Sequence, residues 1–444
     1  MPDRLGRPSD APIDWTAITA EALEVFRAYL RIDTSNPPGH EAPAARYLGG
    51  LLEAEGIPCE YIETAPGREA LVARLRGDGT AGALMLANHT DVVPVDAAAW
   101  SLPPFEGVLR DGRVYGRGAV DMKSTGVMHL FSMILAKRLA LPLRRDLVLL
   151  AAPDEEVGSD QGMAWLVEHR PDLFEIEYCL NEGACGLDEF AGTPSRLFEV
   201  AVSEKQLSPL RLVTTGTPGH GSKPAADNPA VRLVRALQRL EEWDRGLVVS
   251  PVGRAYLERL QVAGLVGDLD DRAALEAALK ASPDTEAAFS NTLNVTMLDA
   301  GIKSNVIPAR AEATIDCRLV AGQSREAWKR AVEERIGDPR VQVEFLYPVE
   351  PDVTVSPWDT PLARVIEDVL TEAFEDAVVV PSTAIVGTDN RFLRPLGIPA
   401  YGFIPCLLSQ AERDGFHAND EFITVANFNL GVELMFEVVR RACT

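Results

Sequence analysis

Five clusters of acidic or histidine residues, each placed after a short apolar run, constrain the fold of this chain more than any other feature. The clusters are Asn88-His89-Thr90-Asp91, Val120-Asp121-Met122-Lys123, Asp154-Glu155-Glu156, Asn181-Glu182-Gly183 and Phe416-His417-Ala418. Short apolar runs separated by helical segments are typical of strands in a largely parallel α/β sheet. Ligand sites of such sheets gather outside the carboxyl ends of the strands. The pattern therefore predicts one convergent site at one edge of a sheet.

The α/β pattern covers the first part of the chain and returns near its end. In the first part we predict strands at 70–75, 83–87, 147–152 and 176–180, and helices at 17–31, 42–56, 123–139 and 161–169. After residue 351 we predict a helix at 361–375, strands at 377–380 and 400–404, and a final helix from about Val425. Thr424 is the predicted N-cap of that last helix, because its hydroxyl can accept a hydrogen bond from the first turn.

The middle segment has a different pattern. It combines predicted strands at 197–202, 210–214, 291–298, 312–319 and 341–346 with helices at 228–245 and 325–335 and a polar helical stretch at 246–290. This mixture indicates an α+β sandwich, one sheet covered by helices. Because His417 follows the segment and the other clusters precede it, a shared site requires the segment to be an insertion. We therefore predict a catalytic domain of residues 1–196 and 351–444, with a mixed, largely parallel sheet and helices on both faces, and an inserted domain of residues 197–350.

Composition limits the classes of partner. The chain has 444 residues and a net charge of −23, and a surface this acidic repels phosphate, so neither nucleic acid nor an anionic membrane is an expected partner. Residues 1–6 contain no apolar segment of the kind a secretory signal needs. The six cysteines form no CxxC pair and are expected to be reduced thiols, so cytoplasm is the predicted location.

The residue types in the clusters suit metal ions. A neutral imidazole such as that of His89 is a good zinc ligand, and a carboxylate two residues on, Asp91, can orient it. Asp121 follows a glycine-rich turn, and its two oxygens could bridge two metals about 3.5–4 Å apart. Each residue also has a simpler interpretation, since His89 with Asp91 could be a capped strand end and Asp121 an ordinary helix N-cap.

Glu155 and Glu156 make the strongest case for a cation. Adjacent carboxylates repel each other in a low-dielectric site unless something cationic holds them. One of the two could bind a metal, while the other takes a proton from water; the alternative is a solvated acidic loop. Glu182 and His417 are weak signals alone, but the order and strand-end placement of all five clusters agree. No glycine-rich phosphate loop and no GxSxG motif is present, so phosphoryl transfer and serine hydrolysis have no support. The five clusters together predict a metal-dependent hydrolase.

These motifs resemble those of the two-zinc metallopeptidase and amidohydrolase family of aminoacylase, acetylornithine deacetylase, succinyl-diaminopimelate desuccinylase, glutamate carboxypeptidase and carboxypeptidase S. They run from Asn36-Pro37-Pro38-Gly39 to Phe416-His417-Ala418-x-x-Glu421. The resemblance implies two zinc ions per chain, with cobalt or manganese possible on the same ligands. It implies one ion on His89 and Glu182, the other on Glu156 and His417, and Asp121 bridging both. It also implies Asp91 as the partner of His89 and Glu155 as the general base and acid.

In this family the inserted domain is a lid that also dimerises. Matching motifs are Gly219-His220-Gly221-Ser222-Lys223-Pro224, Ser304-Asn305-Val306-Ile307-Pro308 and Asp316-Cys317-Arg318. The resemblance implies a homodimer in which His220 reaches the partner's active site and stabilises the oxyanion, although action within its own chain stays open. The stretch Gly387-Thr388-Asp389-Asn390-Arg391 resembles the family's substrate-carboxylate loop.

The expected reaction is therefore hydrolysis of the amide bond of an N-acyl amino acid or a dipeptide with a free carboxylate. Arg318 or Arg391 would bind that carboxylate and Asn305 would add a hydrogen bond, although one of the arginines is expected to pair with Asp316 or Asp389 instead. Glu182 and the long 246–290 stretch resemble the corresponding features of the acyl-amino-acid and carboxypeptidase branches of the family. Met122 is a departure, because many relatives have a second Asp at this position. One alternative is a biosynthetic deacylase of the acetylornithine or succinyl-diaminopimelate type. Another is a binding protein that has lost catalysis, against which the retained Glu155 and metal ligands argue.

Overall fold

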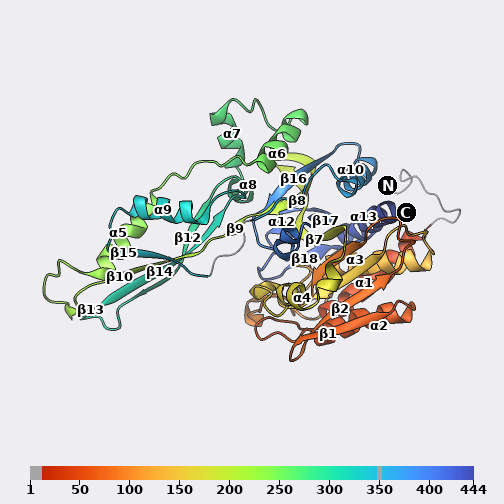
Figure 1. Cartoon of the computed structure of the whole chain (residues 1–444), viewed down its shortest axis with the longest axis horizontal. Coiled ribbons are helices and arrows are strands. Elements are labelled where there is room, and N and C mark those ends of the chain that lie inside the picture. Colours follow the sequence, from red (N-terminus) through yellow and green to blue (C-terminus); the bar gives the residue numbers. More distant parts are fainter. Residues whose placement is uncertain (1–12, 348–352) are drawn as a thin grey trace.

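The computed structural model describes residues 13–347 and 353–444. Residues 1–6 and the predicted domain limit between 350 and 351 therefore lie outside the described residues. Figure 1 shows an elongated molecule, in which a body built on a large sheet carries an arm built on a smaller sheet. Because the arm lies between the two body segments in the sequence, it is inserted, and the body is closed by the last part of the chain.

The body is organised around one eight-stranded sheet. Its order is β1 (Cys59–Ala65), β2 (Arg68–Leu75), β6 (Leu147–Ala152), β3 (Leu84–His89), β7 (Tyr178–Phe190), β17 (Ala400–Leu408), β8 (Thr193–Glu204) and β16 (Ala377–Ala384). The four central strands, β6, β3, β7 and β17, are parallel to one another. Strand β2 is antiparallel to β6, and β8 is antiparallel to β17. The structure thus confirms the predicted mixed, largely parallel sheet.

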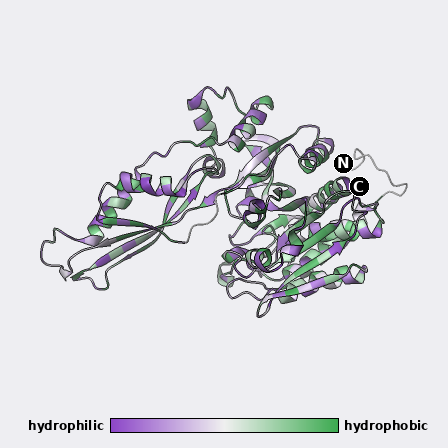
Figure 2. Ribbon diagram, in the orientation of Figure 1, coloured by the Kyte–Doolittle hydropathy of each residue, from purple (hydrophilic) through white to green (hydrophobic). Residues whose placement is uncertain are grey.

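Helices cover both faces of this sheet. One face is covered by α1 (Trp15–Leu30), α2 (Ala42–Ala54), α3 (Lys123–Arg138), α10 (Pro361–Ala373) and α13 (Val425–Cys443), and the other by α4 (Met163–His169) and α11 (Asn390–Leu393). Strand β3 is apolar from Leu84 to Ala87 because both of its faces are covered: Leu84 and Leu86 face the first layer, and Met85 and Ala87 face the second. Figure 2 shows the hydrophobic residues concentrated along these strands. Helix α13 begins as predicted, with Thr424 accepting a hydrogen bond from the N–H of Asn427.

The arm is a two-layer α+β sandwich. Its antiparallel sheet has the order β12 (Thr292–Ala300), β14 (Arg310–Leu319), β10 (Leu210–Thr215) and β15 (Val341–Phe345), and the short β9 (Gln206–Leu207) pairs with β14. Helices α5 (Pro229–Glu241) and α9 (Arg325–Ile336) cover one face, onto which Ala313, Ile315 and Cys317 of β14 point at every second position. At the far end of the arm, β11 (Gly219–His220) pairs with β13 (Val306–Ile307).

The division at residues 196/197 and 350/351 stays a prediction, and two elements bear on it. Strand β8 begins at Thr193 and pairs with β16 in the large sheet, not in the arm. The predicted helical stretch forms α6 (Pro251–Val262), α7 (Arg272–Leu279) and α8 (Pro283–Ala288), and Tyr256 and Leu260 pack with Leu197 of β8 and Val380 of β16. These helices therefore cover an outer part of the body's sheet.

A small sheet of β4 (Val108–Arg110), β5 (Arg113–Tyr115) and β18 (Phe422–Thr424) ties the last part of the chain to the segment before α3. All six cysteines are free. None of the helices in the described part of the chain has the length and apolar character needed to cross a membrane.

Candidate metal centre

Three neighbouring strands, β6, β3 and β7, bring most of the predicted ligands together. His89 and Glu156 lie at or just after the carboxyl ends of β3 and β6, whereas Glu182 lies within β7. His89 is the last residue of β3, and it pairs in register with Ala152, the last residue of β6. Glu156 follows β6 in a single 3-10 turn, η3 (Glu155–Val157). In β7 the pairing of Leu180 with Leu86 places Glu182 at the level of residue 88. Parallel strands of equal register therefore bring these side chains to one edge of the sheet.

Two of the predicted ligands come from outside these strands. Asp121 lies just before α3, and His417 lies between α12 (Gln410–Arg413) and β18. The Nε2 atom of His417 is 3.2 Å from Oδ2 of Asp121 and 3.2 Å from Oε2 of Glu156. Asp121 precedes the arm in the sequence and His417 follows it, so His417 reaches the cluster because the chain returns to the body after the arm.

Asp121 lies between two pairs of predicted ligands, His89 with Glu182 and His417 with Glu156. Its Oδ1 atom is 3.1 Å from Nε2 of His89, and that Nε2 is 3.3 Å from Oε1 of Glu182. Its other oxygen faces His417. Two sets of potential ligand atoms each lie within 4.8 Å of one another: those of His89, Asp121 and Glu156, and those of His89, Glu155 and Glu182. All five predicted ligands and Glu155 are therefore gathered in one cluster.

The electrostatics of the cluster fit a cation. Burial raises the pKa of Glu182 to about 7, and it also raises the pKa of Glu156. Hydrogen bonds to Asp121 and Glu156 raise the pKa of His417 to about 10. Glu156 also has a buried Oε1 atom with no hydrogen-bond partner. Carboxylates and imidazoles at this density are the donor set of a site for two divalent ions such as zinc.

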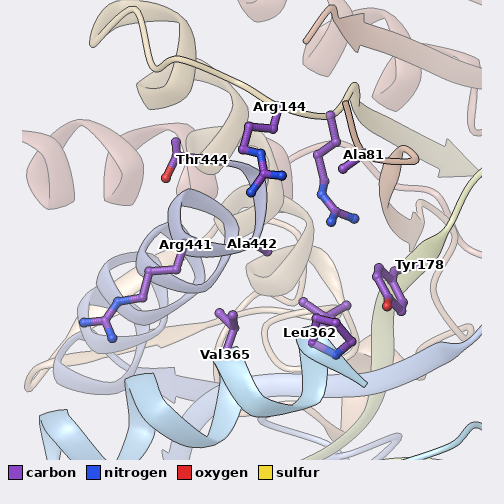
Figure 3. Close-up of a pocket in the computed structure, with 10 residues that line it drawn as sticks. Ala81, Arg144, Tyr178, Leu362, Val365, Arg441, Ala442 and Thr444 are labelled. Atoms are coloured by element: carbon purple, nitrogen blue, oxygen red, sulfur yellow. The ribbon is translucent and has the colours of Figure 1, made fainter. Parts of the chain in front are cut away.

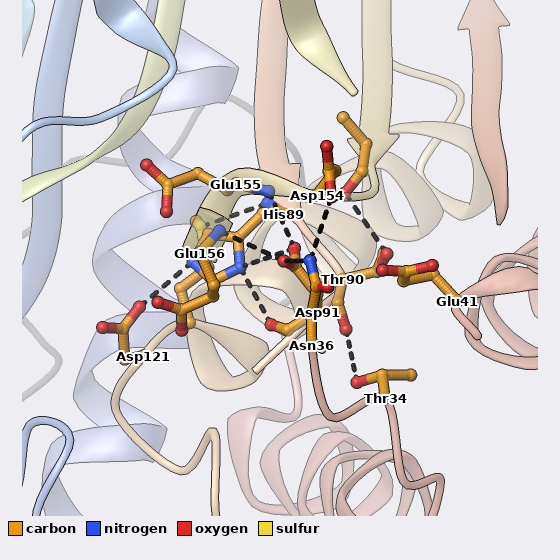
Figure 4. Close-up of polar contacts among 12 residues, drawn as sticks. Thr34, Asn36, Glu41, His89, Thr90, Asp91, Asp121, Asp154, Glu155 and Glu156 are labelled. Atoms are coloured by element: carbon orange, nitrogen blue, oxygen red, sulfur yellow. Dashed lines mark hydrogen bonds and ion pairs between the residues drawn. The ribbon is translucent and has the colours of Figure 1, made fainter. Parts of the chain in front are cut away.

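Asp91 supports the cluster from behind (Figure 4). Nδ1 of His89 is 3.0 Å from the main-chain oxygen of Asp91 and 3.5 Å from its carboxylate, so the carbonyl is the nearer partner. A proton on Nδ1 leaves Nε2 free for a metal. The Asp91 carboxylate accepts hydrogen bonds from the N–H groups of Glu155 and Glu156, both at 3.1 Å. It thus orients the turn that carries these two residues.

A second support holds Asp121 and His417. Glu421 is fully buried and accepts hydrogen bonds from the backbone N–H groups of Gly118, Val120 and Asp121. Arg117 donates to Glu421 at 2.8 Å and to the main-chain oxygen of His417 at 3.3 Å. Sequence reasoning included Glu421 in a motif but gave Arg117 no role. The only signal was its position between two glycines, Gly116 and Gly118.

The predicted carboxylate loop lies next to Glu155. Arg391 is at the start of α11 and donates to the main-chain oxygen of Gly158 at 3.0 Å. Burial raises the pKa of Glu155 well above its usual value, and the nearby Asp389 adds to the effect while Arg391 opposes it. The N–H of Thr388 donates to the buried carboxylate of Glu204, which fixes the loop that begins at Gly387. Within the described residues, no carboxylate forms an ion pair with Arg391.

The two candidate arginines differ. Arg318 lies in β14 of the arm, and its Nε atom is 3.2 Å from Oδ1 of Asp316. It also donates to the main-chain oxygen of Ile385, at 3.4 Å, across to the body. Arg318 is therefore the arginine that pairs with a neighbouring acid, whereas Arg391 has no ion-pair partner among residues 13–347 and 353–444.

The structure does not bring His220 and Asn305 to the cluster within one chain. Both lie at the far end of the arm, where the N–H of Gly221 donates to the main-chain oxygen of Asn305 at 2.8 Å. His220 is exposed, and its Nδ1 atom is 2.7 Å from the hydroxyl of Ser222. A role for either residue therefore depends on a second subunit or on movement of the arm.

A hollow of about 300 Å³ lies elsewhere, at the opposite ends of the central strands (Figure 3). It is lined by Ala81, Arg144, Arg145, Tyr178, Pro361, Leu362, Val365, Arg441, Ala442 and Thr444. None of the predicted site residues lines it, so the metal cluster and this hollow are separate features.

A protein family model and several characterised proteins are similar to this chain. The model of Peptidase family M20/M25/M40 matches residues 85–441. Aminoacylase-1 of Homo sapiens is 29% identical over 427 residues, covering 93% of each chain. The N-fatty-acyl-amino acid synthase/hydrolase PM20D1 of Mus musculus is 29% identical over 385 residues, covering 81% of this chain and 74% of that protein.

Two solved structures share the fold. The M20 family metallo-carboxypeptidase Sso-CP2 from Sulfolobus solfataricus has a TM-score of 0.71 and 22% identity, and covers 95% of this chain and 98% of its own. Human carnosine dipeptidase 1 has a TM-score of 0.71 and 14% identity, with coverage of 97% and 99%. Both the large mixed sheet and the inserted arm therefore have counterparts in proteins of known structure.

Proposed function

The chain belongs to Peptidase family M20/M25/M40, and from this premise we propose that it is a two-zinc hydrolase that cleaves the amide bond of an N-acyl amino acid or dipeptide with a free carboxylate. The observation that carries the proposal is the position of Asp121 between His89 and His417. Glu155 completes it, because this carboxylate lies beside His89 and Glu182 but is not needed to make up either ligand pair.

The residues divide into those that hold ions and those that handle protons. His89 and Glu182 would hold one ion, Glu156 and His417 the other, and Asp121 would contact both. Bound zinc would supply positive charge next to the amide oxygen and lower the pKa of a bound water to about 7.

Glu155 would then act on the reacting atoms. Its carboxylate takes a proton from the attacking water and later donates it to the leaving nitrogen. Asp91 keeps the carboxylate in place through its hydrogen bond to the N–H of Glu155.

Arg391 supports a substrate with a free carboxylate. A guanidinium without a counter-ion suits bidentate binding of a carboxylate, and Arg391 lies close enough to Glu155 to affect its pKa. The names of the similar proteins agree with this substrate class, since they include an aminoacylase, an N-fatty-acyl-amino acid hydrolase, a metallo-carboxypeptidase and a dipeptidase.

Metal analysis combined with a substrate screen tests the proposal. We expect about two zinc ions per chain and amine release from N-acyl amino acids or dipeptides, lost on chelation and restored by zinc. A protein that binds two metals but hydrolyses none of these substrates would contradict the proposed reaction and favour a binding role. Activity limited to acetylornithine or succinyl-diaminopimelate would instead assign a biosynthetic deacylase.

We further propose that two chains form a homodimer through the arm. Strand β12 is at the edge of the arm sheet, and it exposes Val295, Met297 and Leu298, of which Met297 is 67% exposed. An apolar edge strand of this kind is a surface for pairing with another chain. Dimerisation through β12 would allow His220, at the far end of the arm, to reach the metal cluster of the partner subunit.

Mixing two inactive variants tests the action of His220 in trans. Glu155→Gln and His220→Ala chains should each be inactive alone. After subunit exchange, a mixed dimer should contain one site with both groups intact, and activity should return to about one working site per heterodimer. No recovery despite measured exchange would show that His220 does not act across the interface.

The cytoplasm remains our proposed location. The six free cysteines are compatible with a reducing compartment, in which thiols persist. Cell fractionation tests this, and recovery of the protein outside the cell would contradict it.

A further inference from the structure

Arg68 is a buried arginine near the metal cluster, and it has no role in the reaction proposed for Glu155 and the metal ligands. It is the first residue of β2, and its side chain is 9% exposed. The guanidinium donates to the carboxylates of Asp154 and Glu41, to the side-chain oxygen of Asn36 at 2.9 Å and to the main-chain oxygen of Pro38 at 2.8 Å. Among the described residues, no other cation forms an ion pair with Glu41 or Asp154.

Arg68 sets the orientation of the Asn36 side chain. The amide nitrogen of Asn36 donates to Oδ2 of Asp91 at 2.8 Å and to Oδ1 of Asp154 at 3.1 Å, while its oxygen accepts from Arg68. In the flipped orientation, the oxygen would face two carboxylates and the NH₂ group would face a guanidinium. The hydrogen-bond inventory of an amide therefore permits only one arrangement here, and Arg68 determines it.

Asp154, which Arg68 contacts directly, and Asp91, which it contacts through Asn36, hold one turn. Asp154, with the left-handed φ of 74°, precedes Glu155, and its Oδ2 accepts from the N–H of Gln161 at 2.8 Å. A non-glycine residue in this conformation persists only where its surroundings hold it. Asp91 binds the N–H groups of Glu155 and Glu156 from the other side (Figure 4). The turn is thus fixed by Asp154 and by Asp91.

The motif Asn36-Pro37-Pro38-Gly39 forms the binding site for this guanidinium. Asn36 and Pro38 supply two of its acceptors, and Gly39 supplies space. A Cβ atom on Gly39, whose φ is +79°, would lie 2.1 Å from a terminal nitrogen of Arg68. These residues and Arg68 all precede residue 85, where the match to the family model begins.

We propose that Arg68 is a positioning residue of the metal centre, and this inference rests on the proposed function. The guanidinium holds Asp154 directly and Asp91 through Asn36, and the two carboxylates together fix the turn that presents Glu155 and Glu156. Glu155, which handles the proton, and Glu156, a proposed metal ligand, are therefore both positioned by Arg68, which lies in a strand that carries neither of them.

The test compares Arg68→Met with Arg46→Met. Arg46 is a matched control, because it forms an ion pair with Glu69, the neighbour of Arg68, at 2.6 Å on the exposed side. In the metal-free proteins, amide hydrogen exchange at Glu155 and Glu156 should be about 10-fold faster in Arg68→Met and unchanged in Arg46→Met. With zinc bound, kcat should fall about 10- to 100-fold, as for other residues that orient metal-site groups. KM should stay within a few-fold, because no hydrogen bond in the described part of the chain joins Arg391 to Arg68, Asn36, Asp91 or Asp154.

Two further variants keep the test decisive if Arg68→Met does not fold. Arg68→Lys retains the charge but loses the planar fork, so exchange and kcat should lie between those of the wild type and those expected for Arg68→Met. Gly39→Ala should displace the guanidinium and speed exchange at the same two amides. Unchanged exchange at Glu155 and Glu156 in every folded variant would overturn the proposal. A wild type without hydrolase activity would refute the proposed function alone, since the exchange comparison does not use activity.

Discussion

Replacing Glu421 by Gln should destabilise the protein by about 4 kcal/mol. The Glu421 carboxylate is fully buried and accepts four hydrogen bonds, from Arg117, Gly118, Val120 and Asp121, at 2.7–3.1 Å. Each of its oxygens takes two of them. Glutamine keeps one oxygen, so two of these bonds are lost and its NH₂ group faces N–H donors.

The magnitude follows from the charge and the burial. Two hydrogen bonds to a charged group contribute about 3–6 kcal/mol. Breaking a buried ion pair costs about 3–5 kcal/mol, since Arg117 is left buried without a counter-ion. The two figures describe the same loss and are not added. Zinc affinity should fall as well, because the N–H of Asp121 loses its acceptor.

Urea denaturation of the metal-free protein at pH 7.5 measures this cost. Glu60→Gln is the control, because Glu60 pairs with Arg170 at 2.7 Å while its side chain is 53% exposed, and it should cost less than about 1 kcal/mol. If Glu421→Gln also stayed within about 1 kcal/mol of the wild type, the support assigned to the Arg117–Glu421 pair would be wrong.

Two further predictions concern the substrate and acid stability. Amidating the substrate's carboxylate should lower kcat/KM by about 2–4 kcal/mol in transition-state free energy if Arg391 binds it, and full activity on the amide would exclude that contact. His129 in α3 is buried with neither ring nitrogen hydrogen-bonded, and burial lowers its pKa to about 3. The unfolded chain therefore binds a proton near pH 6.5 that the folded chain does not, and the stability lost as pH falls from 7.5 to 5 includes about 2 kcal/mol from His129. His129→Leu should remove that part of the loss in urea denaturation at both pH values, and an identical loss in both proteins would refute it.

The parts of the fold that were predictable depend on local pattern. The apolar runs that end at Ala87 and Ala152 are buried on both faces, and continuous apolar sequence of this kind marks a central parallel strand. Thr424 was recognisable as an N-cap because capping is a property of a few adjacent residues. The pairing of Arg318 with Asp316 follows from their two-residue spacing in one strand, which puts both on one face.

The parts that were not predictable depend on contacts distant in sequence. Arg117 and Glu421 are 304 residues apart, and nothing near Arg117 in the sequence indicates a carboxylate partner. The stretch 246–290 is predicted from its composition to be polar and helical, but composition does not indicate that apolar residues of these helices pack on β8 and β16. The position of His220 relative to a cluster cannot be read from one chain, because it depends on quaternary structure.

The central claim is that two ions and one free carboxylate perform the reaction, and the same substitution at adjacent residues tests it most directly. Metal content and turnover should be measured on the wild type, Glu155→Gln and Glu156→Gln. We predict about two zinc ions per chain in the wild type and in Glu155→Gln, with turnover lost in the latter by at least about 100-fold. In Glu156→Gln we predict reduced zinc content, because one ligand oxygen is lost. Equal loss of metal in both variants, or full turnover in Glu155→Gln, would contradict the account.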